Sequence, residues 1–270
     1  MAGRFDSPSF TLATFNIYMG IDGWGRPFDV IGECRDLAAD ILILQESWNP
    51  DDDGPSTAAR IADALGYQVV HEEGLAHGQI FGPDPAADDR WGPKIAQQGD
   101  ALLLDDERRR RDHRGARGAI PGAWGVAMLA RIPVRDTVVI PLGKLRRDAA
   151  RRMVISAVTD VDGRAVSILG THMSHITHGS AAQYRRLNAS LPDTGTAAVL
   201  AGDMNLWGPP VISFLPAWRR AVKGPTWPAQ RPHSQLDHVL ITPGLSVIEA
   251  RVVAHSGSDH RPVVVRLALT

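Results

Sequence analysis

The 270-residue sequence lacks several features that would place it in a specialised class of protein. It has one cysteine, Cys34, which excludes an intrachain disulfide and a zinc site built on cysteine sulfur. Its 29 Lys and Arg against 30 Asp and Glu give a net charge of −1, so no global positive field draws the chain to polyanions. No apolar run approaches the roughly 20 residues that span a bilayer, and residues 1–10 have no signal-peptide core. We therefore expect a cytoplasmic protein without a membrane span, and interpret Cys34 as a small buried residue on a helix.

The sequence has instead the composition of a globular protein with many short strands. Hydrophobic residues make up 44% of the chain and charged residues 22%. The length and the absence of a convincing linker favour one domain over residues 1–270. About a dozen apolar runs, each closed by a polar or Gly/Pro signal, predict strands: Phe10–Tyr18, Ile41–Gln45, Tyr67–His71, Ala101–Leu104, Val126–Ala130, Thr137–Pro141, Met153–Val161, Ala165–Gly170, Ala197–Ala201, Leu236–Ile241, Ser246–Val253 and Pro262–Leu269.

Helical patterns are fewer and lie between the predicted strands. We expect helices over about 29–39, 56–65 and 180–191, with Ser56 and Ser180 as N-caps and with Leu187 and Leu191 facing inward. Several strand pairs have links of only turn length, which disfavours a continuous βαβ alternation. Two sheets packed face to face, with helices on the outside, satisfy the pattern better.

The segment from about Gly74 to Gly122 has neither pattern, and we interpret it as long surface loops around one strand. It contains the basic run Arg108–Arg117, which could grip phosphate groups but is more commonly a solvated charged loop. Tryptophans in or beside predicted loops could stack on a base, sugar or lipid chain, or form small local cores: Trp48, Trp91, Trp124, Trp207 and Trp227.

Polar residues stand at the ends of apolar strands, where burial would normally exclude them. They are Asn16, Glu46, His172, Asp203 and Asn205. Strand ends hold side chains rigidly, and converging oxygen ligands suit a hard cation such as Mg²⁺ or Mn²⁺. Each residue alone could equally be a turn former, a helix cap or a loop anchor. The hypothesis of an active site depends on their occurring together.

An ordered set of short motifs carries a resemblance to a known family. The set is Thr14-Phe-Asn16, Leu44-Gln-Glu46, Gly125 to Pro133, Gly170-Thr-His172, Gly202-Asp203-Met-Asn205, Leu236-Asp237-His and Ser258-Asp259-His260-Arg-Pro262. In this order it resembles the endonuclease/exonuclease/phosphatase superfamily, which has the deoxyribonuclease-I-like fold. The resemblance implies a four-layered αββα sandwich of two mostly antiparallel sheets, with the active site at one end of the sheets.

The resemblance also implies a role for each residue of the site. Glu46 would be the main carboxylate ligand of Mg²⁺ (or Mn²⁺), supported by Asn16 and Asp259. Asp237 would orient the His260 imidazole. Asp203 would position or deprotonate the attacking water, while His172 and Asn205 would donate hydrogen bonds to the phosphate. The choice between Asp203 and His260 as the base stays open, and the reaction would be a direct in-line attack by water.

Three further residues keep two interpretations each. Arg131 departs from the family pattern because Ala130 precedes it where serine is common, and it could contact substrate or brace a strand end. His175 and His178 follow His172 closely, which is compatible with a second metal site or, more commonly, with loop residues at the rim of the cleft.

The resulting functional prediction is a Mg²⁺-dependent phosphodiesterase acting on a phosphoester substrate, with nuclease as the leading subtype and nucleic acid as one candidate partner. The near-zero net charge argues against a tight, sequence-independent DNA binder. The alternatives are a phosphomonoesterase, a lipid phosphoesterase of the sphingomyelinase or inositol-phosphate kind, and a non-catalytic binding module. The oligomeric state stays open, with a monomer favoured.

Overall fold

Two β-sheets form the centre of the protein. The computed structural model describes residues 8–81, 95–99, 119–193 and 195–270. Within these ranges the first sheet contains β1 (Ser9–Asn16), β2 (Ile41–Pro50), β3 (Gln68–Phe81), β4 (Ile95–Gly99), β5 (Ala119–Ala130), β12 (Leu245–Val252) and β13 (Val263–Leu269). The second contains β6 (Val134–Lys144), β7 (Arg151–Val161), β8 (Arg164–His172), β9 (Ala197–Asp203), β10 (Arg219–Arg220) and β11 (Asp237–Ile241).

The two sheets have related topologies. The strand orders are β12-β13-β1-β2-β5-β3-β4 and β10-β11-β9-β8-β7-β6. β1 and β2 are parallel neighbours in the first sheet, and β8 and β9 are parallel neighbours in the second. Every other neighbouring pair of the described strands is antiparallel. In the second sheet the two parallel strands end together at His172 and Asp203, whereas in the first sheet β1 ends at Asn16, opposite Gln45 of the longer β2.

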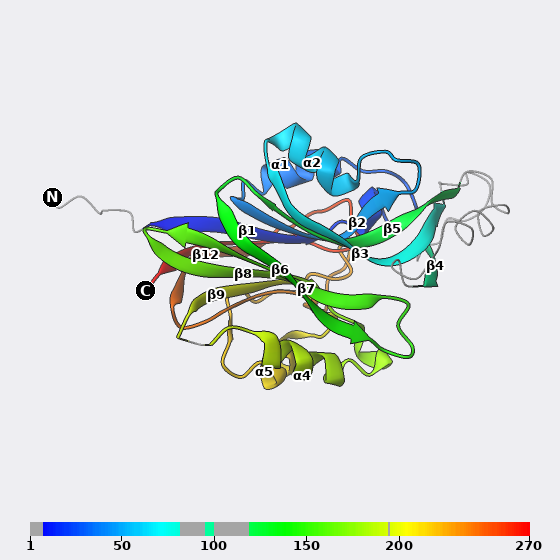
Figure 1. Cartoon of the computed structure of the whole chain (residues 1–270). Coiled ribbons are helices and arrows are strands. Elements are labelled where there is room, and N and C mark those ends of the chain that lie inside the picture. Colours follow the sequence, from blue (N-terminus) through cyan, green and yellow to red (C-terminus); the bar gives the residue numbers. More distant parts are fainter. Residues whose placement is uncertain (1–7, 82–94, 100–118, 194) are drawn as a thin grey trace.

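Helices cover the outer face of each sheet. Figure 1 shows α1 (Val30–Asp36) and α2 (Thr57–Leu65) on one outer face, and α4 (Ala181–Ser190) and α5 (Gly208–Phe214) on the other. The predicted four-layered αββα sandwich is confirmed. In the described ranges, no helix combines the length and the apolar character needed to cross a membrane.

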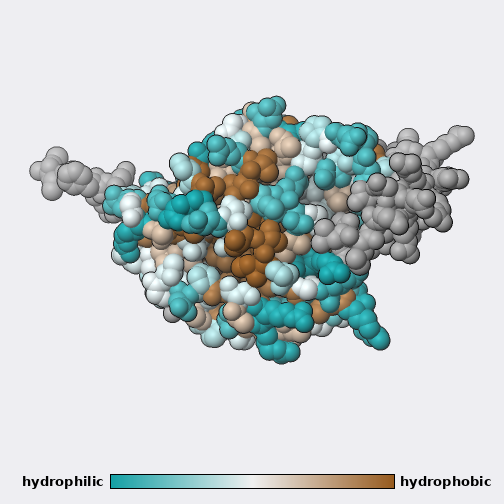
Figure 2. Space-filling view, viewed as in Figure 1, coloured by the Kyte–Doolittle hydropathy of each residue, from teal (hydrophilic) through white to brown (hydrophobic). Residues whose placement is uncertain are grey.

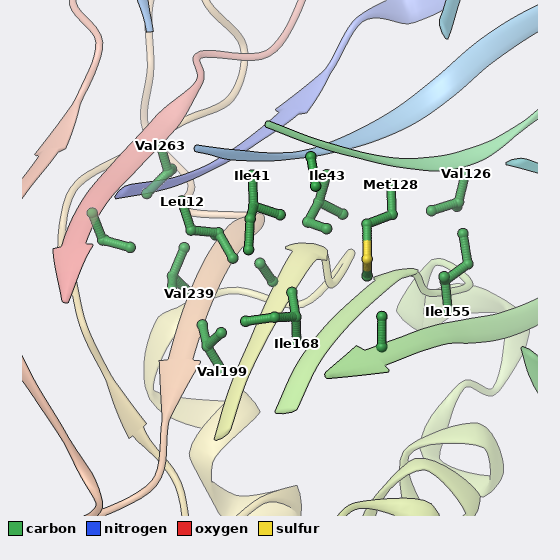
Figure 3. Packing of buried hydrophobic residues seen from close by; sticks show 14 of the residues in the cluster. Leu12, Ile41, Ile43, Val126, Met128, Ile155, Ile168, Val199, Val239 and Val263 are labelled. Carbon is green, nitrogen blue, oxygen red and sulfur yellow. The ribbon is translucent and has the colours of Figure 1, made fainter. Parts of the chain in front are cut away.

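The side chains of each central strand alternate between two cores because successive Cβ atoms point to opposite faces of a sheet. In β2, Ile41 and Ile43 enter the core between the sheets, whereas Leu42 and Leu44 pack against the helix layer. Figure 3 shows the inter-sheet core, with Ile41 and Ile43 facing Val199 and Ile168 of the second sheet. The near-continuous apolar runs of the sequence follow from burial on both faces of the sheets.

The predicted helices are present, with differences at their ends. Ser56 caps α2, because its hydroxyl accepts a hydrogen bond from the Ala59 amide at 3.0 Å. Ser180 is the N-cap residue of α4, as predicted, but its side chain makes no capping hydrogen bond. Its backbone is already in the helical region, and its buried hydroxyl has no partner among the described residues. Leu187 is fully buried and Leu191 partly buried, as expected, and Cys34 is buried on α1.

The segment predicted as loops between about 74 and 122 is partly strand. β3 continues to Phe81 and β5 begins at Ala119, and the two pair along this length. Trp48 and Trp124 were assigned to loops but are buried in β2 and β5, where they are paired neighbours. The predicted strand 101–104, the basic run 108–117 and Trp91 lie outside the described residues.

One face of the molecule has a group of apolar residues near its middle (Figure 2). Figure 2 shows hydrophobic residues gathered there, in the view of Figure 1, with hydrophilic residues above and below. Val69 of β3 and Val138 of β6 are among the exposed large hydrophobic residues, at 43% and 53% exposure. β6 is an edge strand and β3 lies next to one. Val70 and Val139, the residues that follow the two exposed valines in the chain, pack against the inter-sheet core.

Candidate active site

The parallel strand pairs bring the polar residues of the two sheets together. Asn16 ends β1, and His172 and Asp203 are paired neighbours at the ends of β8 and β9. The Asn16 amide donates to Asp203 Oδ2 at 3.2 Å and to Glu46 Oε1 at 3.1 Å. Asn16 therefore links residues of both sheets at one end of the sandwich.

Glu46 has an unusual backbone conformation. It lies at a β-bulge between Gln45 and Ser47, and its φ of 57° is in the left-handed region, which a residue with a side chain rarely adopts. The bulge interrupts the regular alternation of β2 and aims the Glu46 carboxylate at the site. Burial, and next the charge of Asp259, raise the pKa of Glu46 to about 7.

Asp203 is held by two hydrogen bonds from opposite directions. Oδ1 accepts a hydrogen bond from the backbone N–H of Asn205 at 2.8 Å, and Oδ2 accepts one from the side-chain amide of Asn16. The preceding Gly202 lies so close to β8 that a Cβ would be 1.9 Å from the Thr171 carbonyl oxygen. Burial, opposed by the charge of His260 and reinforced by Asp237, raises the pKa of Asp203 to about 6. The carboxylate can therefore exchange a proton near neutral pH.

His260 and Asp237 form a buried pair. His260 Nδ1 lies 2.8 Å from Asp237 Oδ2, and Nε2 lies 3.8 Å from Asp203 Oδ2. Burial disfavours the charged imidazole, but the charges of Asp237, Asp259 and Asp203 outweigh it and hold the pKa of His260 well above its usual value. The imidazole is thus a buried cation among carboxylates.

His172 is a neutral counterpart to His260. Its Nε2 lies 3.1 Å from Asn205 Nδ2 and 3.5 Å from Asp203 Oδ2. Burial, and next the positive charge of Arg152, hold the pKa of His172 well below its usual value. A neutral imidazole and an amide side by side offer hydrogen bonds without adding a charge.

Two carboxylates of the site have few partners. Glu46 accepts a side-chain hydrogen bond from Asn16, and Asp259 accepts only long bonds of 3.4 Å from Trp227 Nε1 and Ser258 Oγ. Burial raises the pKa of both carboxyl groups, and the charge of Asp259 raises that of Glu46 further. A cation between the two carboxylates would relieve this repulsion. Carboxylate and amide oxygens fit a hard divalent cation.

Comparisons with known proteins agree with this arrangement. The sequence matches the profile of the Endonuclease/Exonuclease/phosphatase family over residues 13–260. The chain belongs to the endonuclease/exonuclease/phosphatase family. Members of this family are hydrolases that act on phosphoesters. The matched range includes every residue of the candidate site described above, from Asn16 to His260.

Solved structures with the same fold come from distant organisms. A family protein from Beutenbergia cavernae DSM 12333 is 24% identical, with a TM-score of 0.64 over 97% of this chain and 72% of that one. The human Nocturnin catalytic domain, solved with a bound sulfate anion, is 18% identical, with a TM-score of 0.62 over 97% and 94%. A mannosyl-6-phosphatase from Bacteroides thetaiotaomicron VPI-5482 is 13% identical, with a TM-score of 0.61 over 97% and 100%. A search of curated proteins finds no match.

Arg131 does not lie with the other residues of the candidate site. It follows β5 at the end where Ala130 pairs with Ile41, whereas the site is at the other end of β2. Its guanidinium lies over the Tyr67 ring at 4.2 Å and donates to the Leu65 carbonyl at 3.0 Å. This position favours the alternative that Arg131 braces a strand end, and it removes Arg131 from the candidate substrate contacts.

His175 and His178 form a ring pair beyond β8, in and beside the 3-10 helix Ile176–His178. Their ring centroids are 6.1 Å apart. The group of possible metal ligands that the described residues contain is Asp203, Asp237 and His260, and it includes neither. The structure therefore gives the pair no third ligand for a second metal within the described ranges.

Two contacts of His172 in the candidate site, with Trp124 and with Arg152, were not predicted from the sequence. The Trp124 ring lies 5.5 Å from the His172 ring, and Arg152 lies over the same tryptophan at 5.2 Å. Arg152 also donates to the His172 carbonyl at 3.3 Å and pairs with buried Asp148. Arg152 stands in a run of charged residues that resembles an exposed surface, so no sequence signal marked it as buried.

His238, next to Asp237, gives a prediction about acid stability. Burial lowers the pKa of His238 to about 4, and the imidazole bonds to the Leu206 and Gln235 carbonyls. A histidine with a depressed native pKa stabilises the fold fully above its unfolded value near 6.5, and this is lost as pH falls toward 4. We expect the wild type to lose about 3 kcal/mol more between pH 7 and 4 than His238→Gln.

Urea unfolding at pH 7, 5 and 4 measures this difference. His255→Gln is the matched control, because His255 is exposed. Parallel pH curves for the wild type and His238→Gln would contradict the prediction.

Proposed function

We propose that the protein is a Mg²⁺- or Mn²⁺-dependent phosphodiesterase that cleaves its substrate by in-line attack of water. One observation carries the proposal: eight polar side chains from both sheets converge at one end of the sandwich. They are Asn16, Glu46, His172, Asp203, Asn205, Asp237, Asp259 and His260. Burying so many ionisable groups together costs stability, and such clusters are typical of functional sites.

Three of these residues would hold the cation. Glu46 and Asp259 supply carboxylates, the charge of Asp259 raises the pKa of Glu46, and Asn16 supplies an amide beside Glu46. When bound, the ion would polarise a phosphoryl oxygen and stabilise the leaving oxygen. Mg²⁺ and Mn²⁺ both favour this oxygen set, whereas zinc favours more nitrogen or sulfur.

The other five residues would act on water and phosphate. Asp203 would take the proton of the attacking water while the bond from phosphorus to the leaving oxygen breaks. His172 and Asn205 would donate hydrogen bonds to the phosphoryl oxygens. His260 would contribute positive charge from Nε2 while Asp237 holds Nδ1. The sequence left open whether Asp203 or His260 is the base, and a charged His260 supports Asp203.

Nuclease is the subtype that we favour. We also propose that the protein is a single domain, cytoplasmic and monomeric. A phosphomonoesterase is the nearest alternative, and the similarity in fold to a mannosyl-6-phosphatase supports it. A lipid phosphoesterase ranks lower, and a non-catalytic binding module lower still, because such a module gains nothing from a buried cluster of carboxylates and imidazoles.

Hydrolysis of bis-p-nitrophenyl phosphate tests the proposal. We expect turnover with Mg²⁺ or Mn²⁺, none with EDTA, and a loss of at least about a hundredfold in Glu46→Ala. Glu249→Ala, an exposed carboxylate on β12, is the matched control and should behave as the wild type. Undiminished turnover in EDTA, or in Glu46→Ala, would contradict metal-dependent catalysis.

A further inference from the structure

A cavity of about 550 Å³ lies among the loops that follow β9 and precede β11. Its lining includes Trp207, Arg220, His233 and Gln235. The volume is within the usual range for a small-molecule site, roughly 300 to 1,000 Å³. Neither the proposed metal ligands nor the proposed catalytic groups line it, so the proposed reaction leaves the cavity without a role.

The cavity is connected to the active site on two sides. Trp207 follows Asn205 by two residues in the chain. Gln235 donates from Nε2 to the Asp237 carbonyl at 3.3 Å. The loop between Gly224 and Gln235 is tied to the segment of the proposed metal ligand as well, because the Ala229 amide donates to the Asp259 carbonyl at 2.7 Å. The cavity and the active site therefore share a wall.

The ring of Trp227 lies within that wall. Its Nε1 donates to Asp259 Oδ2 at 3.4 Å, and its ring meets the ring of His233, which lines the cavity, edge to face at 5.6 Å. A molecule that reaches from the proposed metal ligands into the cavity would pass this tryptophan.

The charge of the cavity is positive. Arg220 is its permanent cation, and no Asp or Glu lies among the described residues that line it. The side chain of the partly buried Arg220 makes no ion pair or hydrogen bond with the described residues, whereas its backbone pairs with β11. An arginine without a carboxylate partner, held in a cavity, has its hydrogen-bonding edge free for an anion.

The absence of a side chain at Gly208 makes room for the Arg220 guanidinium. A Cβ on Gly208 would be 2.0 Å from Arg220 Nη1, so the guanidinium packs directly against the glycine backbone. Trp207, the residue before, is 51% exposed. The sequence thus places a flat aromatic ring and a guanidinium group at adjacent points of one cavity.

We propose that this cavity binds a nucleotide unit next to the scissile phosphate, with its phosphate on Arg220 and its base on Trp207. Guanidinium groups bind phosphate oxygens in pairs, and indole rings stack on any base. The inference rests on the proposed phosphodiesterase function, because it places a second phosphate of the same substrate. The unit belongs to a short single-stranded oligonucleotide or to a small phosphorylated dinucleotide.

Dinucleotide substrates that differ by one phosphate test the inference. Thymidylyl thymidine is compared with its 5′-phosphorylated and 3′-phosphorylated forms, and bis-p-nitrophenyl phosphate serves as the substrate without a nucleotide. We expect the wild type to cleave one phosphorylated form with a kcat/KM at least about tenfold above the unphosphorylated form. Arg220→Gln should abolish that preference and leave bis-p-nitrophenyl phosphate within about twofold.

Two variants separate the charge of the cavity from other effects. Arg219→Gln removes the same charge from the same strand, but the Arg219 side chain donates to the Leu245 carbonyl, and it should keep the preference. Gly208→Ala displaces the Arg220 guanidinium without changing any charge, and it should weaken the preference. If Arg220→Gln unfolds, Gly208→Ala and Arg220→Lys carry the test.

Each outcome decides the inference. Equal kcat/KM for the three dinucleotides, or equal effects of Arg219→Gln and Arg220→Gln, would overturn it and leave the phosphodiesterase standing. Faster cleavage of octathymidylate than of the phosphorylated dinucleotides assigns the unit to an oligonucleotide, and the reverse to a small molecule. If bis-p-nitrophenyl phosphate is not cleaved at all, the proposed function fails, and calorimetric binding of the phosphorylated dinucleotides decides for the cavity: weaker binding in Arg220→Gln alone supports it, and equal binding overturns it.

Discussion

Asp237→Asn is expected to lower kcat by about a thousandfold with little effect on folding. The substitution keeps the shape of the side chain, and the amide oxygen can still accept the hydrogen bond from His260 Nδ1, now 2.8 Å from Asp237 Oδ2. The other carboxylate oxygen, Oδ1, is buried without a partner among the described residues, so the substitution breaks no hydrogen bond there. What the variant loses is the negative charge that keeps the imidazole positive.

The measurement is kcat for bis-p-nitrophenyl phosphate, with thermal unfolding as the check on the fold. The two residues act as a unit, so Asp237→Asn combined with His260→Gln should be no slower than His260→Gln alone. Asp160→Asn, an exposed carboxylate on β7, is the matched control for the loss of charge. Wild-type kcat in Asp237→Asn would remove the pair from the mechanism, and additive losses in the double variant would show that the two residues act separately.

Much of the site could be predicted because its residues interrupt apolar strands. Asn16, His172 and Asp203 each end a strand that is buried on both faces, and a polar residue there is conspicuous in the sequence. The parallel pairing of β1 with β2 and of β8 with β9 then brings these ends to the same edge. The order of the motifs supplied the rest, since the sequence alone does not say which strands are parallel.

Other features depend on strand direction and on burial, which the sequence does not state. Arg131 follows an apolar strand in the same way as Asp203, yet β5 runs antiparallel to β2 and carries it to the opposite end of the sheet. Glu46 needs a bulge, which depends on the pairing of two strands. Trp124 comes just after the segment predicted as loops and was placed in or beside it, yet it lies within β5. Gly122 and Gly125 allow close approach of β5 to adjacent strands.

Gly122 and Gly125 illustrate why the partner of a residue decides its environment. A Cβ on Gly125 would be 2.0 Å from the Glu73 carbonyl oxygen, and one on Gly122 would be 2.4 Å from the Asn49 carbonyl oxygen. Close approach of this kind comes from segments far away in the chain. The glycines indicate a turn only when those segments are unknown.

The largest effect on stability is expected from Arg152→Met, at about 3–5 kcal/mol in the free energy of unfolding. Arg152 is 6% exposed, and its Nε donates to Asp148 Oδ2 at 2.8 Å. Burial raises the pKa of the Asp148 carboxyl, but the hydrogen bond and charge of Arg152 outweigh it and lower the pKa overall. Removing the guanidinium leaves a buried carboxylate whose remaining partners, Ser174 and the Ala150 amide, are uncharged.

Urea unfolding of a double-mutant cycle measures this coupling. Asp148→Asn combined with Arg152→Met should destabilise by clearly less than the sum of the single variants, because the buried charge is then removed with its partner. Arg135→Met is the matched control: Arg135 pairs with Asp160 at 3.2 Å on the surface, and its loss should cost less than about 1 kcal/mol. Equal losses for Arg135→Met and Arg152→Met would contradict the prediction. Because Arg152 also donates to the His172 carbonyl and packs on Trp124, the folded fraction of Arg152→Met should have a lower kcat, whereas Arg135→Met should not.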